Sequence, residues 1–95
     1  MNKSHLASVT AIISGRVQGV FFRDFTQRLG TEMGLTGYVT NLSGGKSVEA
    51  MAEGEKAKLE EFISRLRVGP PAAAVSEVSV EWSDYSGRFT DFSIK

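Results

Sequence analysis

The residues of this chain most suited to chemistry lie together between Gly15 and Arg23, a segment with two glycines that ends in an arginine. A strand is expected before this segment and a helix after it. The segment would then end at the start of a helix, where the first N–H groups are unpaired and the helix dipole is positive. Glycine at 15 and 19 lets successive N–H groups turn inward around an anion. Arg23 can donate two parallel hydrogen bonds to a phosphate. These residue types favour a phosphate-binding loop.

The glycine spacing by itself is not specific for a ligand. An ordinary turn followed by a solvent-exposed Arg23 explains the spacing better when nothing else is considered. The segment lacks the Gly-Lys-Ser/Thr ending of nucleotide-binding P-loops, and no further glycine completes the dinucleotide fingerprint. The loop is therefore a candidate for binding one phosphate group, and the neighbouring sequence is needed to distinguish this function from an ordinary turn.

The hydrophobic pattern predicts the elements that would position this loop. Apolar residues recur with strand-like spacing in five segments and with helical spacing in two others. The expected strands cover residues 8–14, 35–42, 47–53, 77–82 and 89–95, and the expected helices cover 22–33 and 55–67. This β-α-β-β-α-β order, with a short extra strand, is typical of the ferredoxin-like split βαβ fold of the α+β class. We expect an antiparallel sheet with two helices on one face.

The length of the chain and the polarity of its residues predict the domain organisation and which other residues are buried. The 95 residues are expected to form a single domain, 1–95, with a flexible segment at 1–7. Trp82 and the phenylalanines are expected in the core. The charged stretch from Glu53 to Glu61 is expected on the solvated side of the second helix. His5 receives no role, because it is the only histidine and has no partner for catalysis or metal binding.

Composition excludes several classes of function. The chain has 11 Lys and Arg and 11 Asp and Glu, and this zero net charge argues against nucleic acid as a partner. The absence of cysteine excludes disulfides, thiolate nucleophiles and sulfur metal sites, and it favours the cytoplasm. No stretch offers the roughly 20 apolar residues that cross a bilayer, and the N-terminus lacks a secretory signal. We expect a cytoplasmic monomer with no membrane partner.

The whole string from Ile13 to Arg23, Ile-Ser-Gly-Arg-Val-Gln-Gly-Val-Phe-Phe-Arg, closely resembles the first signature of the acylphosphatase family. Gly37-Tyr38-Val39-Thr40-Asn41 resembles the second signature, which has a glycine, an aromatic, a small apolar residue and then an asparagine. Ala52-Glu53-Gly54 and Gly69-Pro70 are also familiar from the family. Matches of this length, spread over most of the chain, are far more specific than paired glycines.

This resemblance implies a small ferredoxin-like enzyme that hydrolyses the carboxyl–phosphate anhydride of a small-molecule acyl phosphate. It implies no metal and no other cofactor. Arg23 would hold the phosphoryl group, and Asn41 would orient the attacking water. The phosphate-binding loop would comprise Gly15, Arg16, Val17, Gln18, Gly19, Val20, Phe21 and Phe22. The chemistry suits these residues, because a carboxylate leaves without a general acid and phosphoryl transfer mainly requires positioning and charge stabilisation.

Asn41 also has a simpler interpretation, since it precedes Ser43-Gly44-Gly45 and asparagine is common at turns. Its parity in the expected strand matches Val39, which would place it on the inward face beside the loop. The chain departs from the family pattern here. Thr40 replaces a basic or longer residue, Ser43 and Gly44 stand where proline and aspartate are common, and the hairpin carries one extra residue. We expect a bulge or a longer turn.

Two other functions fit the same predicted fold. A non-catalytic regulatory module would keep the phosphate-binding loop, and it would bind phosphate or another anion without hydrolysis. An RNA-binding domain would need exposed aromatic residues on its central strands, and the expected strand 47–53 contains none. Acyl phosphate hydrolysis is therefore the leading hypothesis.

Overall fold

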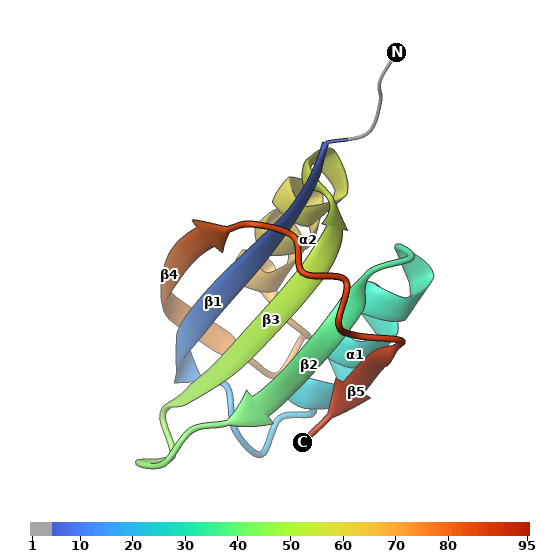
Figure 1. Ribbon diagram of the computed structural model, residues 1–95. Coiled ribbons are helices and arrows are strands. Elements are labelled where there is room, and N and C mark those ends of the chain that lie inside the picture. The colour runs from blue at the N-terminus through green and yellow to red at the C-terminus, as the bar shows by residue number, and fades with distance from the viewer. Residues whose placement is uncertain (1–4) are drawn as a thin grey trace.

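A computed structural model describes residues 5–95 and shows a sheet that carries both helices on one face (Figure 1). The strands are β1 (Leu6–Arg16), β2 (Thr36–Asn41), β3 (Ser47–Glu55), β4 (Ala74–Ser83) and β5 (Phe92–Ile94), and the helices are α1 (Phe22–Glu32) and α2 (Lys56–Val68). Across the sheet the strands lie in the order β4-β1-β3-β2-β5. The predicted element order and the ferredoxin-like arrangement are confirmed.

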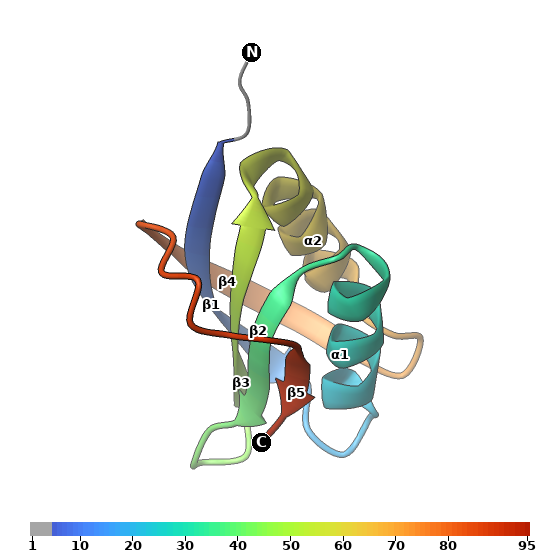
Figure 2. The ribbon, with the colours of Figure 1, turned by 45° about the vertical axis from the view of Figure 1, so that its right-hand side comes forward.

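The sheet differs from the prediction at both ends of the chain. β5 lies parallel to β2, whereas every other pairing is antiparallel as expected. The reason is that the chain crosses the open face of the sheet after β4 and so enters β5 in the direction of β2 (Figure 2). At the other end, Leu6 pairs with Glu55, so residues 6 and 7 belong to β1 and not to a flexible segment. The first four residues of that expected segment lie outside the described residues.

The core lies between the helices and the sheet. The predicted apolar stripe of α2 is buried, and alternate residues of β1 and β3 face it as their period of two requires. The almost completely buried residues of the core include Val9, Ala11, Ile13, Val48, Ala50, Ala52, Leu59, Phe62 and Leu66. None of the helices in the described residues is long and apolar enough to cross a membrane.

The short strand β5 is anchored to this core by Phe92. Its ring packs on Phe62, with the ring centroids 5.7 Å apart. It also lies directly on Gly30 of α1, where an added Cβ would stand 2.5 Å from the ring. Only glycine admits such a close approach, so Gly30 allows β5 to sit against α1.

Two aromatic residues that we expected in the core lie at the surface. Trp82 is 39% exposed near the end of β4, where the ammonium of Lys56 lies 5.4 Å from the ring centroid. Phe21 is 81% exposed in the loop before α1. Residue type indicates burial only where another layer packs on the position, and neither the end of an edge strand nor this loop has such a layer.

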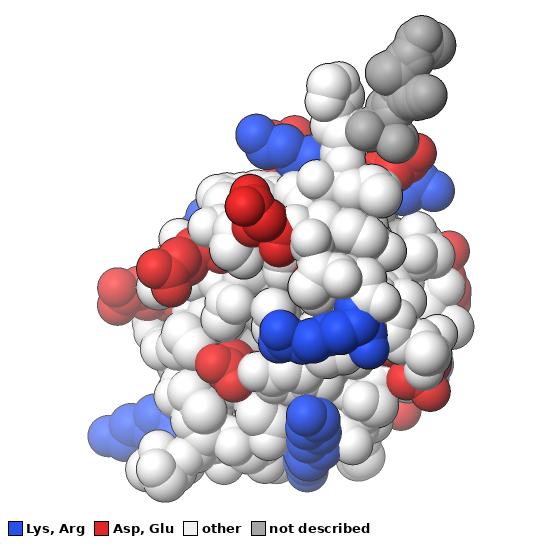
Figure 3. Space-filling view, viewed as in Figure 1, with Lys and Arg blue, Asp and Glu red and all other residues white. Residues whose placement is uncertain are grey.

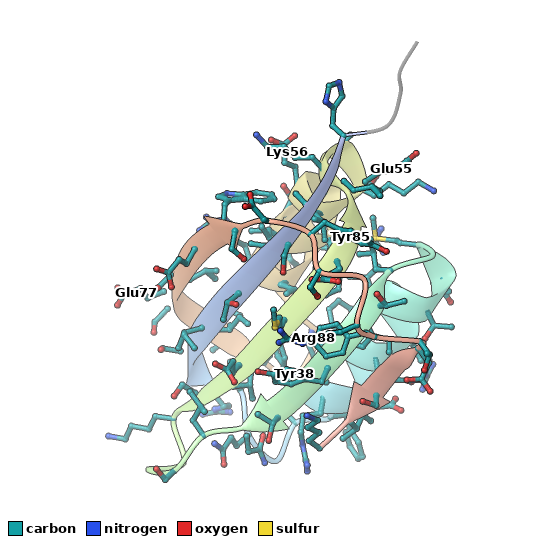
Figure 4. All side chains as sticks on the ribbon, in the orientation of Figure 1. Tyr38, Glu55, Lys56, Glu77, Tyr85 and Arg88 are labelled. Carbon is teal, nitrogen blue, oxygen red and sulfur yellow. The ribbon has the colours of Figure 1, made fainter. Side chains whose placement is uncertain are left out.

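The segment 84–91 crosses the open face of the sheet and packs on it (Figures 1 and 4). The rings of Tyr38 and Phe89 lie 6.0 Å apart, and the guanidinium of Arg88 lies 4.8 Å from the Phe89 centroid. Acidic and basic side chains are interspersed over this face without a broad basic patch (Figure 3). The central strand β3 contains no aromatic residue, whereas an RNA-binding platform needs exposed aromatic residues on its central strands.

Glu53 holds this segment against the sheet, which contradicts our expectation that the stretch 53–61 is solvated. Its side chain is 1% exposed. Its carboxylate accepts hydrogen bonds from the N–H of Ser86 at 3.0 Å, the hydroxyl of Ser86 at 2.7 Å and the N–H of Gly87 at 3.0 Å. Burial alone raises the pKa of Glu53, but these hydrogen bonds outweigh burial and the pKa lies below its ordinary value.

Replacing Glu53 by Gln is expected to lower the free energy of unfolding by about 1.5–3 kcal/mol at neutral pH, because the charge-assisted hydrogen bonds are lost. The folded-state pKa is lowered, so this contribution is present above the unfolded-state pKa of about 4.3 and is lost as the pH falls through the folded-state pKa. Urea unfolding of wild type and Glu53→Gln at a series of pH values measures this difference in the free energy of unfolding. Glu60→Gln, on the exposed side of α2, is the matched control. Equal stability of the two variants at neutral pH would contradict the role of Glu53.

Candidate active site

The loop between β1 and α1 has backbone angles typical of an anion-binding nest. Gly19 and Phe21 are left-handed, with φ of 75° and 64°. Phe21 is the only non-glycine residue of 5–95 with a positive φ, a conformation that costs about 1 kcal/mol or more. Left-handed residues of this kind turn neighbouring N–H groups toward one side. α1 then begins at Phe22 without a side-chain cap, which leaves its first N–H groups open to a ligand.

A cleft of about 330 Å³ opens beside this loop. Its lining residues come from the loop after β1, the start of α1, the end of β2 and β5. These segments meet at one end of the molecule (Figures 1 and 2). The cleft brings together the two sequence motifs, because Arg23 and Asn41 both line it. Its lining residues are Val17, Gly19, Phe21, Phe22, Arg23, Asp24, Asn41 and Ile94.

Four residues of the predicted phosphate-binding loop do not line the cleft. Gly15 and the exposed Arg16 end β1, where a bulge interrupts the pairing with β4. Val20 packs against the core. Gln18 turns its side chain to the β2–β3 hairpin. The side chains of Gln18 and Val20 therefore serve the fold around the cleft.

Arg23 lies in the first turn of α1, and its Nη1 donates a hydrogen bond to the main-chain oxygen of Lys95 at 3.3 Å. A guanidinium has five N–H donors, so most of them stay available to a ligand. The neighbouring Asp24 also lines the cleft, but its carboxylate pairs with Arg28 one turn later at 2.7 Å. That pairing offsets the repulsion that Asp24 would otherwise exert on an anion.

Asn41 is the last residue of β2 and pairs with Val48 of β3. It has the parity of the fully buried Val39, so its side chain lies on the helix side of the sheet, as predicted. Its Oδ1 atom is buried and accepts no hydrogen bond from the described residues. Buried carbonyl oxygens normally have a partner, so this atom can accept a hydrogen bond from a water or a ligand in the cleft.

The described residues do not gather metal-ligating side chains at the cleft. Within residues 5–95, no group of three or more His, Asp and Glu side chains is placed to hold a metal ion. His5 lies just before β1, and its main-chain oxygen accepts a hydrogen bond from the N–H of Lys56 at 2.8 Å.

The fold and the cleft define a class, a ferredoxin-like domain with a cleft beside the loop that follows its first strand. A profile of the acylphosphatase family matches residues 9–94. An acylphosphatase of Dehalococcoides mccartyi is 52% identical over 85 residues, which cover 90% of this chain and 93% of the relative. The crystal structure of the Bacillus subtilis acylphosphatase aligns with a TM-score of 0.89 at 36% identity and covers 96% of this chain and 99% of that one.

A structure of an acylphosphatase from Coxiella burnetii aligns over all of both chains, with a TM-score of 0.90 at 36% identity. The chain therefore belongs to the acylphosphatase family, and it is an enzyme of the hydrolase class. The resemblance seen in the two sequence signatures is confirmed at the level of the family.

The two loop glycines are expected to respond differently to substitution by alanine. A Cβ at Gly15 would lie 2.3 Å from the carbonyl oxygen of Ala74, so Gly15→Ala should cost at least about 2 kcal/mol of stability. A Cβ at Gly19 meets nothing within 4 Å, so Gly19→Ala should cost only the left-handed strain of about 1–2 kcal/mol. Urea unfolding of both variants measures the difference. A larger loss for Gly19→Ala than for Gly15→Ala would contradict this account of the loop.

Proposed function

We propose that the chain hydrolyses acyl phosphates to a carboxylate and inorganic phosphate. Arg23 and the loop N–H groups hold the phosphoryl group, and Asn41 orients the attacking water. The observation that carries this proposal is that Arg23 and Asn41 line one cleft, and that the buried Oδ1 of Asn41 has no hydrogen-bond partner among the described residues. Membership of the acylphosphatase family supports the class of reaction.

The proposed reaction is a single displacement at phosphorus. A bond forms between the water oxygen and phosphorus, and the bond between phosphorus and the acyl oxygen breaks, with its electron pair leaving on the carboxylate. Such a leaving group needs no general acid, and phosphoryl transfer mainly requires alignment and charge stabilisation. Arg23 and the first N–H groups of α1 supply the charge stabilisation. Asn41 Oδ1 accepts a hydrogen bond from the water, and a phosphate oxygen takes the released proton.

The cleft would select for the phosphate more than for the acyl group. Its polar donors are Arg23 and main-chain N–H groups, which suit phosphate oxygens. Phe21 and Ile94, which also line it, are 81% and 44% exposed and offer no polar recognition. We therefore propose a range of small acyl phosphates as substrates, hydrolysed without a metal ion or another cofactor.

Replacing Arg23 by Ala is expected to lower kcat/KM for acetyl phosphate by about 10²–10³-fold, because a preorganised donor to the transition state is lost. The measurement is phosphate release by wild type and variant in the presence of EDTA, which wild-type activity should survive. Arg67→Ala, on the exposed side of α2, is the control and should keep wild-type rates. Full activity of Arg23→Ala would rule out the proposed role, and loss of wild-type activity with EDTA would rule out metal independence.

Replacing Asn41 by Ala is expected to act on the rate and not on phosphate binding. With no side chain to orient the water, kcat should fall on the order of 10²-fold, whereas the inhibition constant of inorganic phosphate should change little. Steady-state kinetics with phosphate as a competitive inhibitor separates the two. An equal loss in both constants would assign Asn41 to phosphate binding. A wild-type protein that binds phosphate but never turns over acetyl phosphate would instead favour the non-catalytic module.

A further inference from the structure

Gln18 links two parts of the candidate site that are far apart in the sequence. Its Nε2 donates one hydrogen bond to the carbonyl oxygen of Leu42 and one to that of Ser47, both at 2.8 Å. The two hydrogens of the amide nitrogen are therefore both used. The amide is partly buried, and both acceptors belong to the β2–β3 hairpin.

These acceptors stand where the hairpin closes. Leu42 directly follows Asn41, and Ser47 directly precedes Val48, the residue that pairs with Asn41. Leu42 and Ser47 also bond to each other, because the N–H of Leu42 donates to the oxygen of Ser47 at 3.0 Å. Gln18 thus binds both strands at the last rung before the turn.

The turn itself provides little other support for this end of β2. Residues 43–46 are exposed, and Gly44 and Gly45 have positive φ, so the turn adds no packed side chain. One further bond joins it to the end of β1, from the N–H of Gly15 to the oxygen of Lys46 at 3.0 Å. The Gln18 amide joins the loop to the hairpin through its two hydrogen bonds. The residues next to this link, Gly19 in the loop and Asn41 before Leu42, both line the cleft.

We propose that Gln18 is a positioning residue that holds Asn41 at a fixed distance from the phosphate-binding loop. This inference rests on the proposed function. Gln18 does not line the cleft, and its amide nitrogen is committed to the hairpin. It acts through Asn41, and a displacement of a reacting group by about 1 Å costs on the order of 10²-fold in rate. Loss of the link should therefore lower kcat and leave phosphate affinity in place.

The test compares unbranched replacements of Gln18 with the same kind of replacement at a matched glutamine elsewhere. Gln18→Met removes both donors and keeps the side-chain length. Gln18→Lys restores a donor. The control is Gln27→Met, because Gln27 also donates from Nε2 to a main-chain oxygen, that of Phe92 at 3.2 Å. We expect Gln18→Met to lose about 10–100-fold in kcat with the phosphate inhibition constant within about threefold of wild type, Gln18→Lys to recover part of the rate, and Gln27→Met to keep it.

Gln18→Glu adds a pH readout that a general loss of stability would not produce. At neutral pH its carboxylate cannot donate to the two carbonyl oxygens, so kcat should be low. As the pH falls and the carboxylic acid forms, one donor returns, so kcat relative to wild type should rise. A constant ratio across pH, or a kcat and phosphate affinity of Gln18→Met that fall together with the free energy of unfolding, would overturn the proposal.

Hydrogen exchange keeps this test separate from that of the enzymatic activity. In phosphate-bound protein, the N–H of Leu42 should exchange faster in Gln18→Met than in wild type or Gln27→Met. Unchanged exchange would overturn the positional role whatever the kinetics. If wild-type protein fails to hydrolyse acetyl phosphate, the proposed function is wrong, and Gln18 has no catalytic effect to exert. Faster exchange of the Leu42 N–H in Gln18→Met would still show that Gln18 holds the hairpin.

Discussion

The antiparallel pairing of β1 with β3 is the constraint on which both halves of the candidate site depend. The pairing runs from Leu6 and Glu55 to Ser14 and Ser47. It therefore brings the loop that follows β1 to the same end of the sheet as the hairpin that carries Asn41. β2 is placed on β3 in turn, so the two cleft-lining motifs meet through one shared strand. A shift of register by one residue would turn the side chains of a strand to its other face.

The placement of Arg23 also depends on the last part of the chain. Glu53 holds the segment 84–91 on the open face, and this segment leads to β5. β5 is anchored by Phe92 between α1 and α2, and the next residue after β5, Lys95, accepts the hydrogen bond from Arg23. A buried carboxylate on the face opposite the helices thus contributes to the placement of an arginine in the cleft. This explains why a short and otherwise exposed C-terminal segment follows a definite path.

Periodicity allowed most of this fold to be predicted, because the stripe of α2 and the alternation of β3 are direct consequences of burial on one side. The two motifs also indicated that Arg23 and Asn41 would lie near one another, and both line one cleft, whereas four residues of the predicted loop do not line it. Two of the errors have a common physical cause. The direction of β5 and the burial of Glu53 depend on contacts with distant main-chain groups, and main-chain N–H and C=O groups carry no sequence signature. The side-chain direction of Gln18 was missed for the same reason, since both of its acceptors are carbonyl oxygens.

The central place of β1 also bears on how the chain folds. β1 is the first strand in the sequence, yet it pairs with β4, so partners such as Val9 and Trp82 come from nearly opposite ends of the chain. Closing so long a loop costs entropy before the contacts form, and non-local pairing slows folding. During synthesis, one edge of β1 has no partner until β4 leaves the ribosome, and unpaired edges invite association with other chains. The strand that organises the finished domain is the one that remains incomplete longest while the protein is made.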